Sequence, residues 1–183
     1  MDDKQTLVVL VQNKPGVLNR VASLFRRRNF NIDSLTVGRT HQEHVSRMTI
    51  VVDAKHTDIR TVTAHLYKLV NVIDVRIVSH EPHVSRDLAL VKVRTDDVES
   101  RNSVTTICER SPARIVDIGT EVTIVEITAQ DDIVETVIKE LAEVGIVEMV
   151  RTGIIAMGRG TRIQDTHYVP TKLPGSNGKR YPV

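Results

Sequence analysis

Residues 7–37 constrain the fold of this chain most strongly, because they combine strand, loop and helix patterns in one short segment. Residues 7–11 form an unbroken apolar run ended by turn formers, which is typical of a buried central strand. Pro15 and Gly16 cannot continue that strand, and Pro15 fits the first turn of a helix, where its missing N–H costs nothing. Five apolar residues then fall on one helical face: Val17, Leu18, Val21, Leu24 and Phe25. The segment predicts a strand, a tight glycine loop, an amphipathic helix closed by Arg26-Arg27-Arg28, and a second strand.

The loop at the start of this helix is a candidate binding site. A helix N-terminus offers free backbone N–H groups and a partial positive charge, which together suit an anion. Gly16 lets a ligand carboxylate approach the backbone closely, and the amide of Asn13 can face an ammonium or a carboxylate. This combination suits a free amino acid better than a phosphate, since the further glycine and Lys-Ser/Thr pair of a P-loop are missing. The alternative is an ordinary strand-to-helix turn with an asparagine cap.

The rest of the N-terminal half continues with strand, helix and strand patterns. Residues 45–52 alternate as a strand after a polar turn at 40–44, and residues 72–78 form another apolar strand. Between them a helix is predicted after a capping residue, Thr57 or Asp58. Its apolar residues at helical spacing are Ile59, Val62, Leu66, Leu69 and Val70. The order βαββαβ predicts a ferredoxin-like antiparallel sheet with two helices on one face, in which the third strand fills the gap between the first two.

The C-terminal half repeats this plan, so we predict an α+β protein with two tandem ferredoxin-like domains. The expected elements are a strand at 88–93, a weaker helix at 97–110, a hairpin of 114–119 and 122–127, a helix from Asp131-Asp132 to Gly145, and a last strand region at 146–157. We assign residues 1–80 to the first domain, 81–86 to a linker with Pro82, and 87–163 to the second domain. Residues 164–183 hold prolines and glycines among polar residues, which predicts an irregular tail.

Charge and composition argue against several classes of protein. The 25 basic and 23 acidic residues give a net charge of +2, so the balance predicts no attraction to nucleic acid or to membranes. The sequence shows no long apolar span and no signal-peptide pattern, and it has one cysteine. We therefore expect a cytoplasmic protein without disulfides.

Patterns for catalysis and metal binding are weak. Cys108 stands alone on the apolar side of a predicted helix, where a cysteine is typically a small core residue. The seven histidines are scattered, and no pair of them comes with further ligands at metal spacing. Asp96-Asp97 and Asp131-Asp132 precede predicted helices, so capping explains them better than acid–base chemistry. We expect a non-catalytic chain with no metal and no cofactor of its own.

Three non-catalytic functions fit this topology, and the fold alone does not choose among them. RNA-recognition modules stack bases on aromatic residues of their central strands, and residues 7–11 and 48–52 contain none, so this function has weak support. A pure assembly module that dimerises through sheet edges is the second. An amino-acid-sensing regulatory domain, which the loop around Gly16 suggests, is the third.

The chain resembles the small, regulatory subunits of acetolactate synthase (acetohydroxyacid synthase). The most specific part of the similarity is the run Asn31-Ile32-Asp33-Ser34-Leu35-Thr36-Val37 followed by Ser46-Arg47-Met48-Thr49. Further resembling segments are Asn13-Lys14-Pro15-Gly16-Val17-Leu18, Asn19-Arg20-Val21, Leu66-Tyr67-Lys68-Leu69-Val70, Leu90-Val91-Lys92-Val93 and Arg151-Thr152-Gly153. The Asn-x-x-Gly-x-Leu loop by itself marks the broader class of ACT domains.

The resemblance implies an N-terminal ACT domain that pairs with another in a homodimer and binds valine, or a related branched-chain amino acid, at the junction. Family members hold this effector with the positions that match Asn13, Gly16, Val17 and Leu18, and with Asn31 and Ile32 supplied across the dimer interface. The resemblance also implies a partner, the catalytic subunit, which carries thiamine diphosphate, Mg and FAD and condenses pyruvate with pyruvate or 2-oxobutyrate. The small subunit would activate this partner and confer feedback inhibition in valine, leucine and isoleucine biosynthesis. The alternative is a generic ACT-type sensing or assembly module for another metabolic enzyme.

Overall fold

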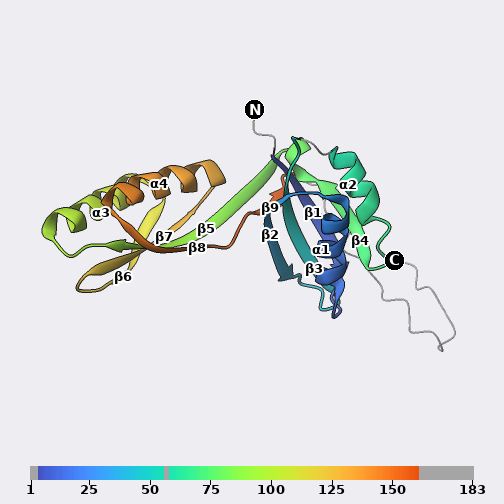
Figure 1. Cartoon of the computed structure of the whole chain (residues 1–183), viewed down its shortest axis with the longest axis horizontal. Coiled ribbons are helices and arrows are strands. Elements are labelled where there is room, and N and C mark those ends of the chain that lie inside the picture. Colours follow the sequence, from blue (N-terminus) through green and yellow to red (C-terminus); the bar gives the residue numbers. More distant parts are fainter. Residues whose placement is uncertain (1–3, 56–57, 161–183) are drawn as a thin grey trace. The chain divides into compact units, whose positions relative to one another are not determined.

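The computed structural model describes residues 4–55 and 58–160, which divide into two compact units (Figure 1). The first unit comprises residues 4–33, 37–82 and 158–160, and the second comprises 34–36 and 83–157. Thr57, one of the two candidate helix caps, and the predicted tail at 164–183 lie outside the described residues. No helix within these described ranges has the length and apolar character needed to cross a membrane.

The first unit has the predicted βαββαβ order. Its elements are β1 (Lys4–Gln12), α1 (Val17–Arg28), β2 (Ile32–Arg39), β3 (Val45–Asp53), α2 (Ile59–Leu66) and β4 (Val72–Ile77), followed by the 3-10 turn η1 (Val78–His80). The sheet order is β2-β3-β1-β4, so β3 fills the gap between β1 and β2 as the crossover rule predicts. The central strand β1 pairs antiparallel with β3 and β4, and Leu7 lies opposite Ile50 and Ile77.

The core of this unit is aliphatic and centred on β1. Residues 7–11 are each at most 1% exposed, which confirms the buried strand that the apolar run predicts. The buried face of α1 consists of Val17, Val21, Leu24 and Phe25, and that of α2 consists of Ile59, Val62 and Leu66. These residues recur at helical spacing, so each helix presents one apolar stripe to the core.

Two expectations about these helices are wrong. Leu18 belongs to the predicted apolar face of α1, yet its side chain is 45% exposed, because it lies at the edge of that stripe in the first turn. The helix α2 ends at Leu66, and Val70 beyond it is 91% exposed. The hydroxyl of Tyr67 accepts a hydrogen bond from the Val75 N–H at 3.0 Å, which directs the chain into β4 instead of a further helical turn.

The second unit repeats the topology of the first. Its elements are β5 (His83–Arg94), α3 (Val98–Arg110), β6 (Ala113–Ile118), β7 (Val122–Ala129), α4 (Asp131–Val144), β8 (Ile146–Arg151) and β9 (Ile155–Gly158). The sheet order β6-β7-β5-β8 corresponds strand by strand to β2-β3-β1-β4, and α3 and α4 cover the same face of the sheet (Figure 1). The core lies under these helices and contains Ala89, Val91, Val93, Val104, Ile107, Val125, Ile127, Ala129, Val134, Val137 and Leu141.

The structure differs from the sequence expectations at three places in this unit. The strand β5 begins at His83, inside the segment 81–86 that the sequence analysis assigns to a linker. The single strand region expected at 146–157 is divided into β8 and β9, both paired with β5, because the chain turns at Gly153 with a φ of 80°. The residue that precedes α4 is Gln130, so Asp131 and Asp132 occupy the first turn and do not cap the helix.

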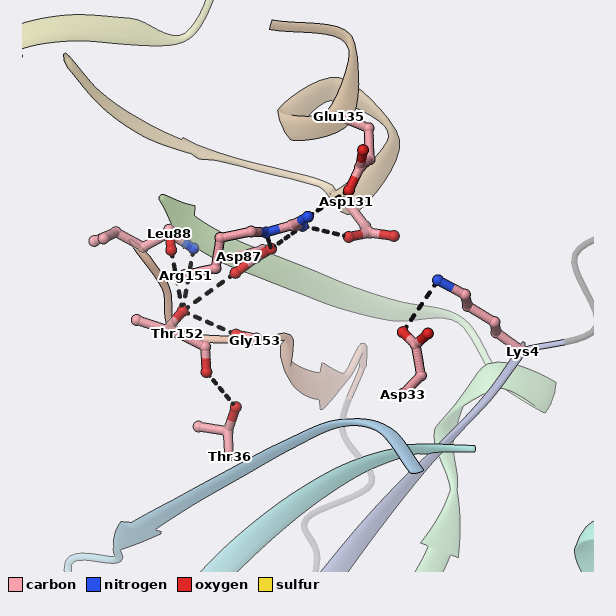
Figure 2. Close-up of polar contacts among 10 residues, drawn as sticks. All are labelled: Lys4, Asp33, Thr36, Asp87, Leu88, Asp131, Glu135, Arg151, Thr152 and Gly153. Atoms are coloured by element: carbon pink, nitrogen blue, oxygen red, sulfur yellow. Dashed lines mark hydrogen bonds and ion pairs between the residues drawn. The ribbon is translucent and has the colours of Figure 1, made fainter. Parts of the chain in front are cut away.

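Arg151 joins three carboxylates at the end of β8 (Figure 2). Its Nε donates to Asp87 on β5 at 2.7 Å, one terminal nitrogen donates to Asp131 at 2.7 Å, and the other donates to Glu135. The hydroxyl of Thr152 also donates to Asp87, at 3.3 Å. Asp87 is only 1% exposed, so these hydrogen bonds replace the water that its carboxylate loses on folding. One guanidinium therefore ties β5 and β8 to the first turns of α4.

This environment stabilises the charged form of the Arg151 guanidinium. Burial disfavours the guanidinium, but the hydrogen bonds and negative charges of Asp87, Glu135 and Asp131 outweigh it and raise the pKa of Arg151 above its ordinary value. The group thus stays charged across the physiological range, and the network gains no pH dependence from it.

We expect Arg151→Met to lower the free energy of unfolding of the second unit by about 3–5 kcal/mol, because it leaves the buried carboxylate of Asp87 without a cation. Urea denaturation followed by circular dichroism and amide hydrogen exchange measures the loss. The matched control is Lys92→Met, which removes an ion pair to Glu148 (2.6 Å) on the same sheet. Both partners of that pair are substantially exposed, so the control should have a much smaller effect. Equal losses in the two variants would contradict the structural role of Arg151.

Candidate functional site

The loop between β1 and α1 is shaped by the backbone of Gly16. This residue is the N-cap of α1 and has φ 80° and ψ −4°, in the left-handed region that glycine adopts without strain. Pro15 lies before the cap and not in the first helical turn, so the expectation that it begins the helix is wrong. A Cβ added at Gly16 would meet no atom within 4 Å, which leaves the space above the loop open.

The first turn of α1 presents unpaired backbone donors in this loop. The N–H of Val17 donates weakly to the Lys14 carbonyl at 3.4 Å, and the N–H of Arg20 makes the first regular helical bond, to Gly16, at 3.1 Å. In the part of the chain that the structure describes, the N–H groups of Leu18 and Asn19 between them have no acceptor. The first turn also contains no acidic residue, so no side chain there offsets the positive end of the helix dipole.

Asn13 is exposed in the same loop and does not cap the helix. Its Nδ2 donates to the Glu43 carbonyl at 3.0 Å, and its backbone N–H donates to the His44 carbonyl at 2.8 Å. Both acceptors lie in the turn between β2 and β3. Within the described ranges, the side-chain oxygen of Asn13 receives no hydrogen bond. The turn therefore fixes the amide nitrogen and leaves the oxygen available to an ammonium donor.

The six candidate residues fall into two groups. Asn13, Gly16, Val17 and Leu18 lie together in the loop and the first turn of α1, where Val17 is buried and the other three are exposed. Asn31 and Ile32 lie after the other end of α1, where the Asn31 carbonyl accepts from the Asp53 N–H at 3.2 Å. The 12 residues of α1 span about 18 Å, at 1.5 Å per residue. One chain therefore does not bring the two groups together around a small molecule.

Comparison with known proteins places the whole described chain in one family. A family model described as the AHAS small subunit-like ACT domain matches residues 7–74, and one described as the small subunit of acetolactate synthase matches residues 86–160. The acetolactate synthase small subunit of Mycolicibacterium smegmatis is 43% identical over 157 residues, which cover 86% of this chain and 92% of the relative. The chain belongs to the acetolactate synthase small-subunit family.

Two further relatives agree with this membership. The probable acetolactate synthase small subunit of Archaeoglobus fulgidus is 44% identical over 159 residues, covering 87% of this chain and 99% of the relative. The crystal structure of the acetolactate synthase small subunit from Thermotoga maritima superposes with a TM-score of 0.78 at 37% identity, over 87% of this chain and 99% of that one. The resemblance given by the sequence motifs is thus confirmed, and so is the fold of two ACT-like units.

Three side chains beside the loop interact in a way that the sequence of this small-subunit family member does not predict. Arg20 in α1 donates to the Oδ1 of Asn71, and the Nδ2 of Asn71 donates to the Oε1 of Gln12 at 2.8 Å. Asn71 follows Arg20 by 51 residues, so no local pattern predicts their contact. The only signal in the sequence is that Gln12 and Arg20 flank the loop on either side.

A cysteine, clusters of possible metal ligands and a groove are further features that could form a functional site. Cys108 is half-buried against the core of the second unit, and burial raises the pKa of its thiol, which disfavours the reactive thiolate. Among the described residues no group of three or more His, Cys, Asp or Glu side chains could hold a metal ion. The groove of about 870 Å³ between α3 and α4 lies far along the chain from the loop, and Glu140 on its rim is paired with Arg110 at 3.0 Å. Its lining is an open surface of mixed polar and apolar residues between the helices, not an enclosed, mainly apolar pocket.

Proposed function

We propose that this chain is the regulatory subunit of acetolactate synthase. In this proposal it associates with the thiamine-diphosphate-dependent catalytic subunit, raises its activity, and makes it sensitive to valine or a related branched-chain amino acid. Thiamine diphosphate, Mg and FAD belong to the catalytic partner and not to this chain. Membership of the acetolactate synthase small-subunit family supports the partner, and the loop at Gly16 supports the effector. A generic ACT-type sensor of another enzyme is the alternative, which the family membership disfavours.

The observation that carries the effector site is the open N-terminus of α1. The N–H groups of Leu18 and Asn19 can donate to the effector carboxylate, and the left-handed backbone of Gly16 lets it come close. The free side-chain oxygen of Asn13 accepts from the effector ammonium. A zwitterion thus finds donors and an acceptor within one short loop. The exposed side chain of Leu18 offers an apolar contact for the aliphatic part of the ligand.

We propose that two chains share each site. Asn31 and Ile32 lie about one helix length from Gly16, so within one chain they are too distant for contact with the same amino acid. A second chain related by a two-fold axis can bring its own Asn31 and Ile32 to the loop. Such a symmetric homodimer carries two equivalent sites, and effector binding stabilises the dimer by linkage.

The first experiment separates catalysis from regulation. The purified chain alone should form no acetolactate from pyruvate, since its sequence shows no pattern typical of a catalytic nucleophile, an acid–base pair or a cofactor loop. Adding it to the purified catalytic subunit should raise the rate and make that rate fall with added valine. Turnover by the chain alone, in a preparation free of catalytic subunit, would overturn the proposal, as would a catalytic subunit whose rate it leaves unchanged.

Gly16→Asp and Gly16→Asn form a matched pair that tests the loop. Asp and Asn have the same size and both tolerate the left-handed backbone, so the pair differs in charge alone. The new carboxylate should abolish valine inhibition, because it occupies the place of the effector carboxylate. Gly16→Asn should weaken inhibition less, and activation of the catalytic subunit should survive in both variants. Valine inhibition curves of the reconstituted enzyme measure the difference, and unchanged inhibition in Gly16→Asp would place the site elsewhere.

Complementation tests whether the site is shared. Neither Asn13→Ala nor Asn31→Ala homodimers should bind valine, since each lacks one side of both sites. A heterodimer of the two variants has both asparagines intact in one of its two sites. Equimolar mixing with random exchange makes about half of the dimers heterodimers, so it should restore about a quarter of the wild-type binding capacity. Isothermal titration calorimetry measures the capacity. Absence of recovery, with heterodimers shown to form by mass spectrometry, would contradict the shared site.

A further inference from the structure

The β1–α1 loop is held at both of its ends by one buried side chain. Asn71, in the turn between α2 and β4, is 7% exposed. Its Oδ1 accepts from the guanidinium of Arg20, and its Nδ2 donates to the Oε1 of Gln12 at 2.8 Å. Its backbone carbonyl also accepts from the Gln12 N–H at 2.9 Å. Every polar atom that the Asn71 side chain offers is therefore directed at a residue that flanks the loop.

These two partners define the ends of the loop. Gln12 is the last residue of β1 and immediately precedes Asn13. Arg20 lies one turn into α1, where its own N–H donates to the Gly16 carbonyl at 3.1 Å. On the other side of the loop, Asn13 is bonded to the turn between β2 and β3. The loop is therefore fixed between two turns, and Asn71 supplies the connection to one of them.

The pairing of Arg20 with a neutral amide also has an electrostatic consequence. Within the described residues, no carboxylate lies within ion-pair distance of Arg20, so its positive charge is not neutralised. Asn71 accepts a hydrogen bond from the guanidinium without adding a negative charge. The cation is thereby kept near the open N-terminus of α1, where it favours an anionic group.

We infer that Asn71 is a positioning residue for the amino-acid effector, acting through Gln12 and Arg20. It keeps the N–H groups of the first helical turn and the oxygen of Asn13 in the arrangement that a zwitterion needs, and it holds Arg20 beside them. This inference rests on the proposed function of the same loop. It implies that the turn between α2 and β4 controls the affinity of the candidate site, although this turn lies outside the site.

Asn71→Leu tests the inference, because it keeps a similar volume and removes both hydrogen bonds. Valine affinity of the homodimer, measured by calorimetry, should fall about tenfold or more, since the loop loses its anchor at both ends. The matched control is Tyr67→Phe in the same turn. It removes the hydroxyl that bonds Val75 and Asp74 without touching Gln12 or Arg20. This control should lower the melting temperature comparably and change valine affinity by less than about twofold.

A double-mutant cycle identifies the route of the effect. Gln12→Met removes the acceptor for Asn71 and should weaken valine binding in the same direction. The double variant Gln12→Met/Asn71→Leu should be little weaker than Asn71→Leu alone, because both changes break one network. Additive losses, or an Asn71→Leu variant that binds valine as the wild type does, would overturn the inference. If the wild-type chain itself binds none of valine, leucine and isoleucine, the proposed function fails instead.

Discussion

The left-handed backbone of Gly16 is the constraint on which the candidate site depends. A strand with a buried centre ends at Gln12 and a helix begins at Val17, so the chain must reverse its course within four residues. A residue other than glycine at φ 80° costs about 1–2 kcal/mol, with Asn and Asp as the best tolerated exceptions. Because Gly16 adopts this conformation, the first turn of α1 opens toward solvent with free N–H groups and no side chain above them. The binding chemistry proposed for this protein follows from that geometry.

The second unit shows what happens when the same topology lacks this feature. Its equivalent helix, α3, begins after Asp97, whose carboxylate accepts from the Ser100 N–H at 2.7 Å. This backbone hydrogen bond, with a second one from the Ser100 side chain, lowers the pKa of Asp97, so the carboxylate is charged at neutral pH. Asp97 thus occupies the position at α3 that an external carboxylate would take at α1. Two units with one fold therefore differ in structure at the start of their first helix: α1 has no side-chain cap, whereas Asp97 caps α3.

Local patterns predicted most of the fold and part of the candidate site. The spacing of Val21, Leu24 and Phe25 predicts α1, and Gly16 predicts the open loop, because both depend on neighbours in the sequence. Leu69 and Val70 continue the helical spacing, but the Tyr67 hydroxyl bonds to β4 and α2 ends earlier. Asp131 lies one residue inside α4, after the N-cap Gln130, and its carboxylate binds Arg151, 20 residues away. Pairings such as Arg20 with Asn71 form only when distant segments meet, so no local pattern contains them. Asn31 and Ile32 entered through family resemblance alone, and their role stays a prediction.

The most direct test of the central claim is a titration of the isotope-labelled protein with valine, in which the backbone and side-chain amide resonances are followed by nuclear magnetic resonance spectroscopy. The account predicts saturable shifts of the backbone amides of Gly16, Leu18 and Asn19, together with the side-chain amides of Asn13 and Asn31. The amides in the first turn of α3 should stay unchanged, because Asp97 already occupies that helix terminus. Saturable binding with shifts confined to other parts of the chain would contradict the account. So would the absence of any saturable binding of valine, leucine or isoleucine.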